Sequence, residues 1–160
     1  MKLLLISDTH GYTGTLETLL SRYAGEVQTV CHMGDHADDL LKFRPKYPKL
    51  NMVAVAGNCD YDYNLPSEQI LTVSGKRILM LHGHFLGVKR ELQRLTYYAE
   101  EKGVDACFFG HTHEPVQFQA GSVFVMNPGS LEEPRGSSKA SYGLVEISAT
   151  GEITGEVVLV

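Results

Sequence analysis

Five apolar segments of this 160-residue chain each end in a short glycine-containing turn that carries aspartate, asparagine or histidine. The segments are short and rich in leucine, valine and isoleucine, as buried β-strands are. In chain order the turns read SDTHG, MGDH, GNCD, LHGH and GHTH. The carboxyl ends of strands in α/β sheets share one edge, where ligands bind, so we expect these side chains to converge on one site. They are Asp8, His10, Asp35, Asn58, His82, His111 and His113.

The first of these turns carries an acid and an imidazole two residues apart. If the strand continues in extended form through Asp8 and His10, both side chains point to the same face of the sheet and toward one point. An isolated Asp-x-His sequence is also typical of an ordinary polar turn. The repetition of such turns at five successive strand ends favours a functional site over five unrelated turns.

The remaining pattern predicts an α/β fold in one domain over residues 1–160. Helical spacing of apolar residues predicts helices over 14–24 and 88–101, the latter ended by Gly103, and a short helix is expected over 37–43. Because strands and helices alternate early and strands alone fill the end, we expect a sandwich with sheets inside and helices outside. The predicted strands span 2–7, 27–32, 52–56, a hairpin over 69–81 that turns at Ser74–Gly75, 106–110, 116–119, 122–126, 142–148 and 153–159.

Composition limits the classes of function. The chain has 19 acidic and 14 basic residues and a net charge of −5, which argues against long nucleic acids and membrane surfaces as partners. No apolar run approaches the roughly 18 residues of a membrane span. The three cysteines, Cys31, Cys59 and Cys107, are odd in number and widely spaced, which indicates reduced thiols and a cytoplasmic protein.

The seven side chains of the strand-end turns are all of a kind that binds metals. Four imidazoles, two carboxylates and one amide are more donors than a single tetrahedral ion uses. They suit two ions that share a carboxylate at a spacing of about 3.5–4 Å. With oxygen and nitrogen donors, Mn²⁺ is our first expectation, and Zn²⁺, Ni²⁺ or iron also fit.

The set D-x-H, G-D, G-N, H-G-H and G-H-x-H, with the segment NPGSLEEPR at 127–135, resembles the calcineurin-like metallophosphoesterase superfamily, and in particular its small bacterial and archaeal phosphodiesterases. The resemblance implies a four-layer αββα sandwich with two mixed β-sheets. It also implies that a hydroxide bridging two metal ions hydrolyses a phosphate ester. Carried over by motif, one metal would be held by Asp8, His10 and His113, the second by Asn58, His82 and His111, and Asp35 would bridge them.

The residue after Asn58 departs from the resemblance. Many members have histidine there, which is thought to protonate the leaving group, whereas this chain has Cys59. A thiol with an ordinary pKa near 8.5 is a poor proton donor. The catalytic residues that we predict are therefore Asp35, Asn58, Cys59 and His84, of which His84 could contact the substrate or support a ligand. Asp60 is expected to orient a metal ligand.

Several further questions stay open at this stage. The substrate is expected to be a small phosphate ester, and the sequence does not exclude a homodimer. Two other functions are considered: a protein-binding scaffold, like the retromer subunit that has this fold, and a nuclease that acts on short nucleic acids. Roles at the rim of the site are left open for His36, Asn127, Ser130, Arg135, Tyr61 and Tyr63.

Overall fold

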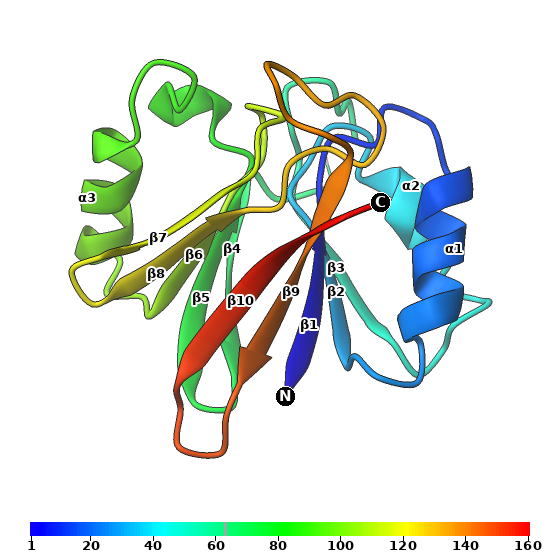
Figure 1. Ribbon diagram of the computed structural model, residues 1–160, viewed down its shortest axis with the longest axis horizontal. Coiled ribbons are helices and arrows are strands. Elements are labelled where there is room, and N and C mark those ends of the chain that lie inside the picture. The colour runs from blue at the N-terminus through cyan, green and yellow to red at the C-terminus, as the bar shows by residue number, and fades with distance from the viewer. Residues whose placement is uncertain (63) are drawn as a thin grey trace.

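The computed structural model describes residues 1–62 and 64–160. Within this part of the chain, the strands form two mixed five-stranded sheets packed face to face, and helices cover both outer faces (Figure 1). The predicted α/β sandwich and its four αββα layers are thus confirmed. The one-domain organisation stays a prediction.

The first sheet has the strand order β10-β9-β1-β2-β3, where these are β1 (Lys2–Ile6), β2 (Thr29–His32), β3 (Asn51–Ala54), β9 (Ser141–Ile147) and β10 (Ile153–Leu159). β1, β2 and β3 are parallel, while β9 runs antiparallel to β1 and β10 runs antiparallel to β9. The three parallel strands therefore end at the same edge of the sheet.

The second sheet has the order β4-β5-β6-β8-β7, where these are β4 (Glu68–Val73), β5 (Lys76–Leu81), β6 (Ala106–Phe108), β7 (Val116–Ala120) and β8 (Val123–Asn127). β5, β6 and β8 are parallel, and β4 and β7 are antiparallel to their neighbours. The carboxyl ends of β5 and β6 approach those of the first sheet, since the His111 N–H donates to the Asp8 carboxylate and His82 Nδ1 donates to the Met33 carbonyl.

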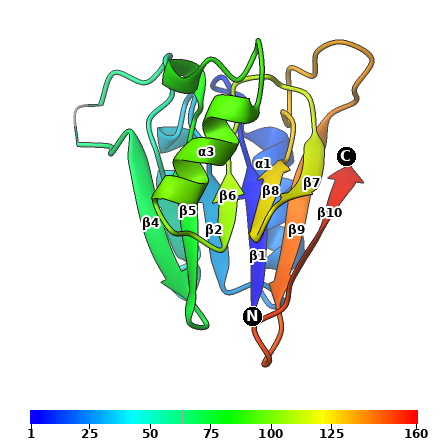
Figure 2. The same ribbon diagram turned by 90° about the vertical axis from the view of Figure 1, so that its left-hand side faces the viewer.

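The helices pack on the two outer faces. α1 (Gly14–Tyr23) and α2 (Asp38–Leu41) cover the first sheet, and α3 (Gln93–Glu101) covers the second (Figure 2). A short 3₁₀ helix, η1 (His84–Leu86), follows β5. Among the described residues, no helix combines the length and the apolar character needed to cross a lipid bilayer.

The alternation of side chains along β1 explains the layers. Leu3 and Leu5 pack between the two sheets, whereas Leu4 and Ile6 pack against α1 and α2, and all four are fully buried. Because successive side chains of a strand point to opposite faces, a strand covered on both sides must be apolar throughout. The uninterrupted apolar run at the start of the sequence reflects this position.

Two predicted elements begin at least two residues later than expected, and the bounds of the others differ by at most two residues. The helix expected over 88–101 begins only at Gln93, and residues 87–90 form a turn after η1. Val88 and Leu92 fit a helical pattern because both pack in the cluster under α3, yet left-handed backbone at Gly83 and Gly87, on either side of η1, turns the chain before Val88. The strand expected over 27–32 begins at Thr29.

Candidate metal centre

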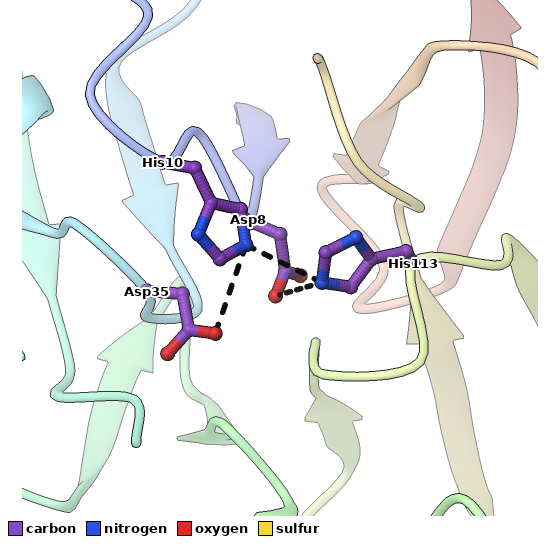
Figure 3. A group of neighbouring side chains, drawn as sticks. All are labelled: Asp8, His10, Asp35 and His113. Atoms are coloured by element: carbon purple, nitrogen blue, oxygen red, sulfur yellow. Dashed lines mark hydrogen bonds and ion pairs between the residues drawn. The ribbon is translucent and has the colours of Figure 1, made fainter. Parts of the chain in front are cut away.

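The loops that follow β1, β2, β3, β5 and β6 bring all seven predicted side chains into two adjoining groups. In the first group, Asp8, His10, Asp35 and His113 each place one nitrogen or oxygen atom so that the four atoms lie within 4.8 Å of one another (Figure 3). His113 Nε2 is 3.2 Å from Asp8 Oδ1 and 3.4 Å from His10 Nε2. Figure 3 shows the two rings turned toward each other, with the carboxylates of Asp8 and Asp35 beside them.

The second group contains Asp35, His82 and His111, whose donor atoms also lie within 4.8 Å of one another. His82 Nε2 lies 3.1 Å from His111 Nδ1 and 3.1 Å from Asn58 Oδ1, so the amide belongs to this group as well. Asp35 is common to both groups. Its Oδ2 lies 3.8 Å from His10 Nε2, and its Oδ1 lies 3.4 Å from His82 Nε2.

The backbone of these turns adopts a conformation that non-glycine residues rarely have. Among the described residues, seven non-glycine residues have a positive φ, and all except Ser74 belong to the strand-end turns: Asp8, His10, Asp35, His36, His111 and His113. Such conformations are strained and cluster at functional sites. The expected extended chain through Asp8 and His10 is therefore wrong, because β1 ends at Ile6 and the turn itself directs both side chains inward.

Glycines make room for the carboxylates. A Cβ atom on Gly57 would overlap Oδ1 of Asp35, and one on Gly110 would overlap Oγ of Ser7 and lie 3.0 Å from Oδ2 of Asp8. Only a residue without a side chain lets these loops approach the carboxylates so closely.

Hydrogen bonds from outside the two groups fix the donors. His82 Nδ1 donates to the Met33 carbonyl at 2.7 Å, and His113 Nδ1 donates to the Glu133 carbonyl at 2.6 Å. In both rings the proton is then held on Nδ1, so that the Nε2 lone pair faces the site. The sequence contains no signal for the Glu133 carbonyl, which lies 20 residues away from its partner.

Asp60 supports the loop of Asp35. Its Oδ2 accepts the N–H groups of Asp35 at 2.8 Å and Gly57 at 2.7 Å, and its Oδ1 accepts that of Ala37 at 2.9 Å. These contacts match the expectation that Asp60 orients a ligand.

Asn127 and Ser130 are also buried supports. Ser130 Oγ donates to the Asp8 carbonyl at 2.8 Å, and Asn127 Nδ2 donates to the Gly110 carbonyl at 2.9 Å. Both side chains stabilise the turns that carry the metal-binding residues, and because they are fully buried they do not lie at the rim of the site.

The electrostatics of the site leave both carboxylates ionised. Burial raises the pKa of Asp8, but the nearby imidazoles of His113 and His82 and the hydrogen bond from Ser7 outweigh burial, so the net shift of the pKa is downward. For Asp35, burial is likewise outweighed by His82 and by the Cys59 N–H, so its pKa falls. Asp8 Oδ1 is fully buried and, within the described residues, accepts no hydrogen bond although His113 lies in ion-pair range.

The two other predicted catalytic side chains lie next to the second group. Cys59 is partly exposed, and burial together with the charge of Asp35 raises the pKa of its thiol to about 11. His84 lies with its ring centre 5.5 Å from that of His82 and 6.1 Å from that of His111. Burial and His82 lower the pKa of His84, so its ring is neutral near pH 7.

Of the other residues whose roles the sequence left open, some lie at the site and others lie on the surface. The ring of His36 lies tilted beside that of His10, with 5.7 Å between the ring centres, and the Arg135 N–H donates to the His113 carbonyl while the Arg135 side chain is exposed. Tyr61 is 87% exposed in the loop after β3, and Tyr63 lies outside the described residues.

Comparisons with known proteins agree with this architecture. The family model described as the calcineurin-like phosphoesterase superfamily domain matches residues 1–150. The probable metallophosphoesterase YsnB of Bacillus subtilis is 35% identical over 148 residues, which cover 92% of this chain and 85% of the relative. The phosphodiesterase YfcE of Escherichia coli K12 is 30% identical over 169 residues, covering 91% of this chain and 88% of the relative.

A solved structure shows the same fold at lower identity. Wild-type Vps29 of Entamoeba histolytica, crystallised in complex with Zn²⁺, superimposes with a TM-score of 0.79 over 99% of this chain and 98% of its own, at 22% identity. At this identity the likeness concerns the fold alone. The family match and the bacterial relatives show that the chain belongs to the calcineurin-like phosphoesterase superfamily.

Proposed function

We propose that the protein is a phosphodiesterase that requires two divalent metal ions. The observation that carries this proposal is the position of Asp35, whose two oxygens face different donor groups, Oδ2 toward His10 and Oδ1 toward His82. A single carboxylate between two sets of imidazoles is the arrangement that a pair of neighbouring cations needs.

The assignment of ligands follows the two groups. Asp8, His10 and His113 would hold one ion, Asn58, His82 and His111 the other, and Asp35 both. Three features of the donor set fit cations. Asp8 Oδ1 is buried without a hydrogen bond among the described residues, two pairs of ring nitrogens lie 3.1–3.4 Å apart, and both carboxylates are ionised.

Metal ions at this site would lower the pKa of water, polarise the phosphate and offset the charge that develops at phosphorus. The chain contributes the positions of the donors, through Asp60 and the carbonyls that hold His82 and His113. Asn58 is exposed at the edge of the site and can also meet the phosphate.

The site has no side chain that is well suited to protonate the leaving group. Cys59 is a thiol, which is a poor proton donor, and burial and His82 lower the pKa of His84, so that few His84 rings carry a proton near pH 7. We therefore infer a preference for esters whose leaving groups are stable as anions. Neither residue is suited to strong general acid catalysis.

The metal is proposed to be Mn²⁺. The donors brought together are nitrogen and oxygen atoms and include no thiolate, so a thiolate-selecting metal has no advantage. Zn²⁺, Ni²⁺ and iron fit the same donors. The cytoplasmic location and a homodimer stay predictions.

Two alternatives were a scaffold and a nuclease. A scaffold needs no complete ligand set, whereas all seven donors converge here, and this favours the enzyme. A nuclease acting on long nucleic acid would need a basic face, which a net charge of −5 does not favour.

The test is an activity screen of metal-depleted and metal-loaded protein over phosphate monoesters, aryl diesters and cyclic nucleotides. The proposal expects metal-dependent hydrolysis with diesters preferred. Absence of hydrolysis of every ester by folded protein that has bound metal would contradict it.

A further inference from the structure

A cleft next to the metal centre is lined by residues to which the proposed function gives no role. Its volume is about 570 Å³, and half-buried Leu92 and Val116 form an apolar wall in front of buried Val88 and Phe109. These side chains belong to the cluster under α3, so the wall is backed by packed core. Lys89, Glu114 and Arg135 supply the charges of the cleft.

The cleft adjoins the proposed metal ligands directly. Thr112 lines it and stands in the chain between His111 and His113. The backbone of Arg135 is joined to the His113 carbonyl by a hydrogen bond of 3.3 Å. A group attached to a phosphate at the metal centre can therefore extend over Thr112 into the cleft.

The charges of the cleft favour an anion. Lys89 and Arg135 are exposed, and within the described part of the chain neither is within 4.0 Å of a carboxylate oxygen. Glu114 opposes them, but its carboxylate is turned toward Gly136, where an added Cβ would lie 2.5 Å from Oε1. The cleft thus combines an apolar wall with a net charge of one positive unit from its three charged residues.

We propose that this cleft binds a second anionic group, carried on a mainly apolar part of the substrate. The substrate class is then a phosphodiester whose other substituent bears a carboxylate or phosphate, and Lys89 and Arg135 determine the preference for it. This inference rests on the proposed function, because it places the reacting phosphodiester at the metal centre.

The direct test compares two esters that differ only in the second anion. They are p-nitrophenyl phenyl phosphate and p-nitrophenyl 4-carboxyphenyl phosphate, which release the same p-nitrophenolate. The measured quantity is the ratio of kcat/KM for the carboxylated ester to that for the plain ester, with Mn²⁺-loaded protein at low salt. We expect a ratio above one that declines as salt is added, since exposed charges are screened.

Substitutions in the cleft show which residues cause the preference for the carboxylated ester. Lys89→Gln and Arg135→Gln should each lower the ratio by about three-fold, the size expected for an exposed charge pair. Glu114→Gln should raise it, and Lys89→Arg, which keeps the charge, should preserve it. Lys49→Gln removes an exposed lysine that does not line the cleft and serves as the matched control.

A binding measurement separates the cleft from the reaction. Calorimetry with phenylphosphonate and 4-carboxyphenylphosphonate requires no turnover and should show the same order of variants. If Lys89→Gln and Arg135→Gln behave like Lys49→Gln with both pairs of compounds, the cleft proposal is wrong while the phosphodiesterase stands. If the wild-type protein hydrolyses neither ester, the wider screen of esters decides the proposed function, and the binding ratio alone decides whether the cleft recognises anions.

Discussion

His32 at the end of β2 should make the metal-free protein sensitive to acid. The ring is fully buried. Its Nδ1 accepts the Gly34 N–H at 3.1 Å, and its Nε2 donates to Thr9 Oγ1 at 3.0 Å. The Thr9 hydroxyl in turn donates to Asp39 Oδ2 at 2.8 Å. This chain of bonds requires a neutral imidazole, because a protonated Nδ1 could no longer accept.

The size of the effect follows from the pKa of His32. Burial lowers this pKa from 6.5 to about 4, although the negative charges of Asp8, Asp60 and Asp39 act to raise it. The unfolded chain therefore binds a proton more readily than the folded protein below pH 6.5, and stability falls as the pH falls. The full shift corresponds to about 3 kcal/mol, of which about 2 kcal/mol is lost by pH 5.

His32→Gln isolates this contribution. Glutamine cannot titrate, keeps a donor toward Thr9 and leaves the Gly34 N–H without its acceptor, which costs about 1–2 kcal/mol at pH 7. Urea unfolding of both proteins in a chelator, followed by circular dichroism, should show that the stability difference moves by about 2 kcal/mol in favour of His32→Gln between pH 7 and pH 5, so that the deficit disappears or reverses. A deficit that is the same at both pH values would refute the reasoning.

Three further predictions concern the metal centre. Asp35→Asn should lower activity more than His84→Ala, because only Asp35 faces both donor groups; equal losses in folded variants would reassign the bridge. Gly57→Ala should lower both the melting temperature and the amount of bound metal, because the added Cβ overlaps Asp35, and a variant with wild-type values would contradict this account of the loop. Diesters should be cleaved more slowly as the leaving-group pKa rises, over a range of roughly 10²–10⁴-fold between aryl and alkyl esters, because Cys59 is a poor acid. A flat dependence, with chemistry shown to be rate-limiting, would mean that another residue donates the proton.

The sequence predicts the location of the site because strand ends are local features. Each turn that carries Asp8, Asp35 or His82 follows an apolar run that is buried on both faces, and such runs are visible without a structure. The parallel arrangement then brings the ends together. These apolar runs and the parallel arrangement of their strands are enough to predict the fold class and the convergence of the seven donors.

Other features depend on contacts that no local pattern contains. Val88 looks helical because it is buried, but burial in a loop against Gly83 gives the same signal. The inward turn of Asp8 and His10 depends on positive φ angles that the sequence does not specify. The tautomer of His113 is set by a carbonyl from a distant segment.

The number of metal ions per chain tests the central claim most directly. Protein purified without oxygen, loaded with Mn²⁺ and freed of excess metal should contain two ions per chain by elemental analysis, and Asp35→Asn should contain fewer. One ion or none in saturated, folded wild-type protein would contradict the dinuclear centre.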